Sequence, residues 1–178
     1  MFQEAGVPVF DADAEVHRLQ GQGGALVGTI EAAFPGTTSA AGVDRQALGA
    51  RVLGDADALG RLEAIVHPAV AERRRAFLEQ HAHERLIVLD IPLLYEKGGP
   101  TDMDAVAVVS APSGVQRERV LARPGMTAEK FERILALQTP DAEKRARADF
   151  VIPTGGDFET TRAAVRAIIS GLSSTADS

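Results

Sequence analysis

The chain contains four short runs of mainly apolar residues, and these runs favour buried β-strands. They lie at residues 7–10, 86–89, 105–109 and 150–152. Apolar and polar side chains do not alternate in them, a pattern that is typical of strands in a parallel sheet buried on both faces. We therefore expect each run to contribute one strand to a parallel sheet.

Helical patterns separate these runs, and most begin at a residue suited to a helix start. The expected starts are Asp44, Asp55, Pro68, Pro112, Thr127 and Asp157. Proline disfavours helical geometry in the residue before it, so we expect His67 to lie at a break between two helices. Strands that alternate with helices predict an α/β fold with a doubly wound parallel sheet.

The first residues of the chain have the pattern of a helix end. Residues 1–5 read as a last turn, and Gly6 stands where a left-handed C-terminal glycine belongs. A helical fragment of about five residues does not form alone. We therefore expect that part of this helix precedes Met1.

Composition limits the class of protein. The chain has 178 residues, of which 45% are hydrophobic, a net charge of -6 and no cysteine. We expect a single domain over residues 1–172 and a disordered tail over 173–178. No apolar run is long enough to span a membrane, and an acidic chain binds nucleic acid poorly. The expected protein is cytoplasmic and monomeric or weakly self-associating, without a membrane or nucleic-acid partner.

Acidic residues follow two of the predicted strands. Asp11 and Asp13 come directly after the first run, and Asp90 follows the second. Ligands of open α/β sheets bind beyond the carboxyl ends of strands, where a carboxylate can accept a proton or hold a metal ion. The alternatives are a helix cap for Asp11 or Asp13 and a turn acid for Asp90.

Basic residues and glycines supply the remaining candidates. Arg119 and Arg123 are four residues apart, so they share a face of the expected helix and could bind phosphate charge, or else form salt bridges. Residues 21–24 contain three glycines but follow a helix and lack a Lys-Ser/Thr pair, so they are not a phosphate loop. Gly155 follows the last strand, where it could leave room for a base or form a turn.

In order and spacing, these segments resemble the dephospho-coenzyme A kinase family. The matching segments are residues 6–13, 62–68, 90–96, 116–123, 126–127, 134–138 and 148–152. The resemblance implies a P-loop kinase fold that transfers the γ-phosphate of ATP, with Mg²⁺, to the ribose 3′-hydroxyl of dephospho-coenzyme A. It also implies a helical acceptor-binding region at about 14–83 and a mobile lid at about 112–138.

The resemblance also implies roles for particular residues. Asp13 would be the general base, Asp90 would support Mg²⁺, and Arg119 and Arg123 would close on the phosphates from the lid. The other implied contacts are Asp11, His67, Pro92, Leu93 and Leu94 with the acceptor, and Arg147 and Gly155 with the nucleotide.

The chain departs from the family pattern at its start and near its end. The family opens with a strand and a Gly-rich loop that ends Gly-Lys-Ser/Thr, whereas this sequence starts inside the following helix. Pro153 and Thr154 also stand where the family usually has an acid and an asparagine. Three hypotheses remain: a kinase whose start lies upstream, a shortened non-catalytic homologue that binds a nucleotide or a partner, and a kinase of the same fold for another acceptor.

We predict that residues 1–178 alone bind ATP weakly and transfer no phosphate. The family's first strand would lie between residues 86–89 and 105–109, and its loop supplies the N–H groups and lysine that hold the phosphates. A chain extended upstream through such a loop should be active. The two forms are assayed side by side with ATP, Mg²⁺ and dephospho-coenzyme A. Full turnover by the 178-residue form would contradict the prediction, because another segment would then hold the phosphates.

Overall fold

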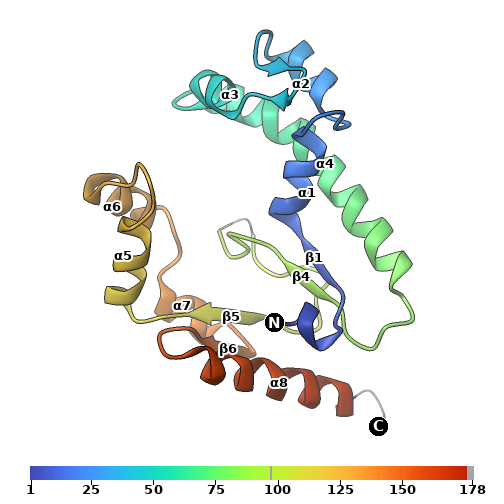
Figure 1. Ribbon diagram of the computed structural model, residues 1–178, viewed down its shortest axis with the longest axis vertical. Coiled ribbons are helices and arrows are strands. Elements are labelled where there is room, and N and C mark those ends of the chain that lie inside the picture. The colour runs from blue at the N-terminus through green and yellow to red at the C-terminus, as the bar shows by residue number, and fades with distance from the viewer. Residues whose placement is uncertain (97, 176–178) are drawn as a thin grey trace. The chain divides into compact units, whose positions relative to one another are not determined.

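The computed structural model describes residues 1–96 and 98–175 (Figure 1). The chain divides into two compact units, one of residues 8–92 and the other of residues 1–7 with 93–178. We call them the acceptor-side unit and the lid-side unit, after the expected helical region at 14–83 and the expected lid at 112–138. Each of these regions lies wholly inside its unit.

The acceptor-side unit combines helices with two short pairs of strands. Its elements are β1 (Val9–Asp11), α1 (Ala12–Gln20), α2 (Val27–Ala33), β2 (Thr38–Ser39), β3 (Gly42–Val43), α3 (Arg45–Val52), α4 (Ala56–Gln80) and β4 (Val88–Asp90). β1 and β4 pair in parallel, with Val9 opposite Val88 and Asp11 opposite Asp90. The two strands predicted for this region are thus confirmed, each ending one residue later than expected. The antiparallel β2–β3 hairpin was not predicted, because two residues per strand leave no periodic pattern.

A helical core holds this unit together. α4 contacts α1, α2 and α3, as Figure 1 shows. Apolar side chains from all four helices form one cluster, in which Ile30 is 0% exposed. The cluster includes Leu19, Phe34, Leu48, Val52 and Ala58. Burial of such side chains contributes roughly 1.5–3 kcal/mol each, so this cluster dominates the stability of the unit.

The predicted helix caps are present, but the predicted break at Pro68 is wrong. The Asp44 and Asp55 carboxylates accept backbone N–H groups at the starts of α3 and α4. α4 then runs without interruption over 25 residues with Pro68 in its interior. A proline removes one helical hydrogen bond, yet side chains on both sides of it, such as Val66 and Val70, pack against the core and outweigh this local loss. His67 is therefore a helical residue and does not lie at a break.

Gly24, in the segment 21–24, and Gly42, in the hairpin, permit close packing at the end of α1. A Cβ atom on Gly24 would lie 2.3 Å from the carbonyl oxygen of Leu19, and one on Gly42 would lie 2.4 Å from that of Gln20. The hairpin and the loop after α1 thus approach the end of α1 more closely than a side chain allows. This agrees with the prediction that the segment is not a phosphate loop.

The lid-side unit pairs two strands against a long helix. Its elements are η1 (Gln3–Ala5), β5 (Ala107–Ser110), α5 (Ser113–Leu121), α6 (Ala128–Ala136), α7 (Asp141–Ala146), β6 (Phe150–Pro153) and α8 (Phe158–Thr175). β5 and β6 are parallel, as predicted. Thr127 and Asp157 cap α6 and α8 through the N–H groups of Lys130 and Thr160.

The strands of this unit are not buried on both faces, in contrast to the expectation. Ile152 packs against Val165 and Ile168 of α8, which lies along the β5–β6 pair in Figure 1. Val151 is 42% exposed, because successive side chains of a strand point to opposite faces. Val109 is 64% exposed. The apolar runs therefore predicted the two strands correctly, but the prediction that both faces of these strands are buried was wrong.

The two ends of the chain are both part of the lid-side unit. Gly6 has a φ of 82° and donates its N–H to the carbonyl of Gln3, as expected for a glycine that ends a helix. α8 continues through Thr175, so residues 173–175 are helical and do not belong to a disordered tail. Residues 176–178 of that expected tail lie outside the described residues. No helix in the described part of the chain is long and apolar enough to cross a membrane.

Candidate active site

Three carboxylates gather where β1 and β4 end. The parallel register places Asp11 beside Asp90. Asp11 caps α1, because its Oδ1 accepts the N–H of Ala14 at 2.8 Å. Asp13 lies in the first turn of the same helix and is exposed. Because Asp11 already serves as the cap, the capping alternative is satisfied without Asp13, and the Asp13 carboxylate is left for another role.

The charges of this cluster affect one another. Partial burial, followed by the negative charges of Asp11 and Asp13, raises the pKa of Asp90 above its ordinary value. Like charges held together favour a proton or a cation at the site. Within the described residues, no group of three or more acidic or histidine side chains is arranged to hold a metal ion by itself. The cluster can therefore accept a proton, or bind a cation that has further ligands from elsewhere.

The other residues expected at the acceptor pocket lie on α4 and in the loop after β4. His67 is on α4, with its Nε2 3.9 Å from Oε1 of Glu63 one turn earlier. The boundary between the two units falls between Pro92 and Leu93. Leu93 has a φ of 57°, which is uncommon for a residue other than glycine and marks local strain. Leu94 accepts the backbone N–H of Gly99 and so closes the loop that follows β4.

The lid-side unit contains a cavity of about 600 Å³, which Arg119 of α5 lines. Its walls are largely apolar, with Phe2, Ile152 and Val165 among them. Thr154 and Gly156, from the loop after β6, supply polar edges. Asp157 adds a carboxylate to the lining. The apolar walls suit a flat base, and the Arg119 guanidinium is the lining group that suits phosphate.

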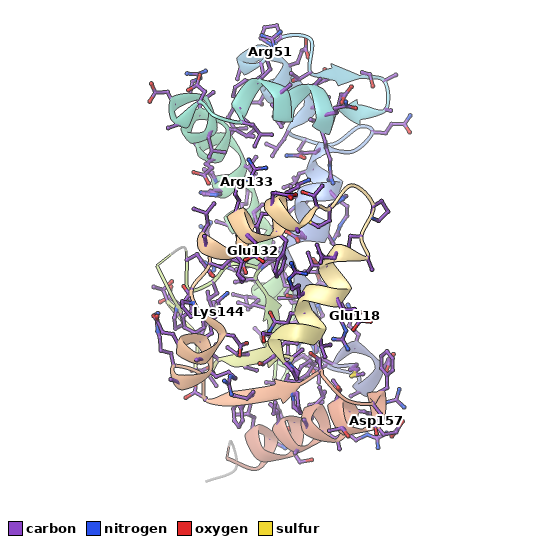
Figure 2. All side chains as sticks on the ribbon, turned by 90° about the vertical axis from the view of Figure 1, so that its left-hand side faces the viewer. Arg51, Glu118, Glu132, Arg133, Lys144 and Asp157 are labelled. Atoms are coloured by element: carbon purple, nitrogen blue, oxygen red, sulfur yellow. The ribbon has the colours of Figure 1, made fainter. Side chains whose placement is uncertain are left out.

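The expected pairing of Arg119 with Arg123 on one helix face is wrong. α5 ends at Leu121, so Arg123 lies in the turn that follows. Arg123 precedes Pro124, and a residue before proline is disfavoured in helical geometry. Arg117 of α5 contacts α6. Its Nε lies 3.7 Å from Oε1 of Glu132, and its Cζ lies 5.8 Å from the centre of the Phe131 ring. Figure 2 shows Glu132 and Arg133 on α6, with Glu118 on α5.

Hydrogen bonds that leave no pattern in the sequence fix the segments on either side of residues 112–138, the expected lid. Oε1 of Glu96 accepts the N–H of Thr139 at 2.9 Å and lies 2.6 Å from Nζ of Lys144. Glu96 is only 13% exposed. Burial alone would raise its pKa, but the hydrogen bonds from Lys144 and backbone N–H groups outweigh burial and lower it. Ser110 donates to the Asp141 carboxylate at 2.8 Å, so the residues that precede and follow the expected lid are tied together.

The residues expected near the nucleotide base do not line the cavity. The Arg147 guanidinium lies 4.4 Å above the ring of Tyr95 and pairs with Glu143 at 3.4 Å. A Cβ atom on Gly155 would lie 2.3 Å from Cδ of Pro112, so this glycine permits close packing at the start of the lid. Its neighbours Thr154 and Gly156 line the cavity in its place.

One feature of the sequence pointed toward Tyr95 and Glu96. Tyr95 and Glu96 end the segment 90–96 that supports the family resemblance, but the linear pattern gave them no role. Glu96 meets Thr139 and Lys144 across more than 40 residues, 43 in the case of Thr139. Such a contact leaves no periodic trace in the sequence.

We predict that Asp90→Asn stabilises the folded chain at neutral pH by on the order of 0.5 kcal/mol. The folded state holds the Asp90 proton more tightly than the unfolded state, so ionised Asp90 destabilises the fold above the ordinary pKa of aspartate. The gain should shrink as the pH falls from about 7 toward about 4. Urea unfolding at several pH values measures it. Asp55→Asn is the matched control, because asparagine caps α4 equally well. A loss of stability in Asp90→Asn at pH 7 would contradict this prediction.

We predict that Glu96→Ala destabilises the chain by about 1–3 kcal/mol, because it leaves Lys144 and the Thr139 N–H without their acceptor. Hydrogen exchange should become faster at Thr139 and through residues 112–138. Glu96→Gln should cost less, since an amide oxygen still accepts from Thr139. Glu118→Gln, at an exposed position of α5, is the control and should change neither quantity. Unchanged exchange at Thr139 in Glu96→Ala would show that the lid is fixed by other contacts.

Comparison with known proteins identifies the family. The family model described as dephospho-CoA kinase matches residues 1–159. A dephospho-CoA kinase of Novosphingobium aromaticivorans is 65% identical, covering 97% of this chain and 86% of the relative. One of Mesorhizobium japonicum is 59% identical, covering 97% and 87%.

Two solved structures share the architecture. The crystal structure of TT1252 from Thermus thermophilus superimposes with a TM-score of 0.77 at 32% identity, covering 96% of this chain and 87% of that one. Dephospho-CoA kinase from Campylobacter jejuni superimposes with a TM-score of 0.61 at 22% identity and the same coverage, which supports the fold. On the family match and the sequence identities, the chain belongs to the dephospho-CoA kinase family.

Proposed function

We propose that this protein transfers the γ-phosphate of ATP to the ribose 3′-hydroxyl of dephospho-CoA, with Asp13 as the general base. The Asp13 carboxylate takes the proton of the 3′-hydroxyl. The 3′-oxygen forms a bond to the γ-phosphorus, and the bond from that phosphorus to the β,γ-bridging oxygen breaks. The products are coenzyme A and ADP, and the proton passes from Asp13 to solvent.

The observation that carries this proposal is the division of roles between Asp11 and Asp13. Asp11 is engaged as the cap of α1, and the same cap fixes the first helical turn, in which Asp13 lies. Asp13 is exposed at the carboxyl end of a parallel strand, the edge at which α/β proteins bind ligands. A positioned carboxylate at that edge is suited to accept a hydroxyl proton.

Asp90 fits the role of a support for Mg²⁺. It lies beside Asp11 in the parallel register, and the negative charges of Asp11 and Asp13 favour a cation there. Magnesium in phosphoryl transfer is commonly held by one or two carboxylates together with substrate phosphates and water, so a complete protein cage is not required. When bound, Mg²⁺ would neutralise charge on the transferred phosphate. Asp90 would hold it, directly or through water.

The cavity of the lid-side unit supports a nucleotide donor. Its apolar walls fit a base, and Arg119 offers a guanidinium to the phosphates. The contacts of Glu96 and Asp141 fix the ends of the lid while leaving its helices to move between them. Arg123 would act from the turn after α5. The protein is proposed to act in the cytoplasm as a monomer or a weak oligomer.

We predict that Asp13→Asn lowers kcat by about 100-fold or more, within the usual range for loss of a general base. The KM for ATP should change little, because Asp13 acts on the acceptor. The assay uses dephospho-CoA in whichever form of the protein turns over, the 178-residue chain or the upstream-extended one. Asp57→Asn, an exposed acid in the first turn of α4, is the matched control.

The acceptor is tested in the same assay. Dephospho-CoA should be preferred over AMP, adenosine and pantothenate, and an analogue without the 3′-hydroxyl should not react. Turnover of Asp13→Asn within a few fold of the wild type would remove Asp13 as the base. Faster phosphorylation of another acceptor would favour a kinase of the same fold with a different substrate.

A further inference from the structure

One arginine of the acceptor-side unit is joined to the turn that carries Asp13. Nη1 of Arg45, at the start of α3, lies 2.5 Å from Nε2 of His17. Nδ1 of the same ring lies 2.9 Å from the backbone oxygen of Asp13. A guanidinium only donates, so Nε2 accepts from Arg45, and Nδ1 carries the proton and donates to Asp13. One neutral imidazole ring therefore separates Arg45 from the residue proposed as the base.

The start of α3 is held rigidly, which fixes the backbone of Arg45. The Asp44 carboxylate accepts the N–H groups of Gln46 and Ala47 and caps the helix. The backbone N–H of Asp44 donates to the carbonyl of Thr37 at 2.8 Å, and Thr37 is 1% exposed. The β2–β3 hairpin thus anchors the residue before Arg45. Arg45 itself is exposed and can meet a ligand.

Arg45 also differs from other arginines of this unit in its partner. Arg18 pairs with Glu15 at 2.6 Å. Arg51 donates to the carbonyl of Pro35, and Arg61 lies over the ring of Phe34. The contact found for the Arg45 side chain in the described residues is with a neutral ring, so its positive charge is not compensated there by a carboxylate.

We propose that Arg45, held by His17, binds the diphosphate on the 5′ side of the acceptor ribose. This inference rests on the proposed function, which brings the 3′-hydroxyl of the same ribose to Asp13. In a nucleotide the 5′-phosphate is only a few bonds from the 3′-hydroxyl, and Arg45 is one ring away from Asp13. A guanidinium presents paired donors that match phosphate oxygens.

The charge of the site requires such a group. Asp11 lies beside Asp90 in the parallel register, and Asp13 follows in the first turn of α1, so the three carboxylates form an acidic cluster. A diphosphate brought close to this cluster would be repelled unless a cation faced it. Arg45 supplies that cation from a fixed helix start. Arg45, held by His17, thereby favours acceptors that carry a 5′-phosphate over unphosphorylated nucleosides.

The test measures binding to the 178-residue chain, so it does not depend on turnover. Calorimetry measures the affinity of dephospho-CoA for the wild type and for the variants Arg45→Ala, Arg45→Lys and Arg51→Ala. The affinity of adenosine for the same four proteins is measured by its competition with dephospho-CoA. Arg45→Ala should weaken the binding of dephospho-CoA about 10- to 100-fold and leave the affinity for adenosine within about twofold of the wild type. Arg45→Lys should lose less, because it keeps the charge. Arg51→Ala, on the same helix, should match the wild type.

The outcomes separate this inference from the proposed function. Unchanged binding of dephospho-CoA to Arg45→Ala would overturn the inference, and so would an equal loss for adenosine, which would indicate a structural role. If Asp13→Asn abolishes turnover while Arg45→Ala binds normally, only the diphosphate site fails. If Arg45→Ala loses dephospho-CoA selectively while Asp13→Asn stays active, the diphosphate site stands and the base assignment fails. A wild-type chain that binds no dephospho-CoA would overturn both.

Discussion

The parallel register of β1 with β4 is the constraint on which the candidate site depends. It sets Asp11 directly beside Asp90 at the end of the pair, and α1 begins at once, so Asp13 follows within a single turn. Three carboxylates are thereby brought to one sheet edge. Partial burial of Asp90, followed by the negative charges of Asp11 and Asp13, raises the pKa of Asp90, so the site is receptive to a proton or a cation.

The helical core of the acceptor-side unit keeps this edge in place. α4 packs against α1, α2 and α3 as one continuous helix, although it contains Pro68. Because α1 is held by the core at Leu19 and by its cap at Asp11, its first turn has little freedom to move. A general base depends on such fixed placement, since proton transfer requires hydrogen-bond geometry with the substrate hydroxyl.

The lid-side unit combines rigid ends with less buried helices. Glu96 and Asp141 fix the two ends of the lid, while α6 exposes apolar side chains, among them Ile134 and Leu135. Few buried contacts between fixed ends are the conditions under which a segment moves as a body.

The sequence by itself determined the strands, most helix starts and the acids at the strand ends. These features depend on neighbouring residues: a run of apolar side chains, a capping carboxylate such as Asp44, or an acid directly after a strand. The family resemblance added roles that local patterns could not supply. The continuity of α4 through Pro68 was decided by tertiary packing, because the contacts of α4 with α1, α2 and α3 outweigh one lost hydrogen bond.

Only the tertiary structure decided which polar groups meet. Asp11 caps α1 and Asp13 stays exposed. From the sequence alone, either of the two aspartates could have been the cap. Arg45 meets His17 across 28 residues, and Glu96 meets Thr139 across 43. Such pairs are brought together by burial of the core and by strand register. Since neither process leaves a periodic mark at the polar positions themselves, the linear sequence could not reveal them.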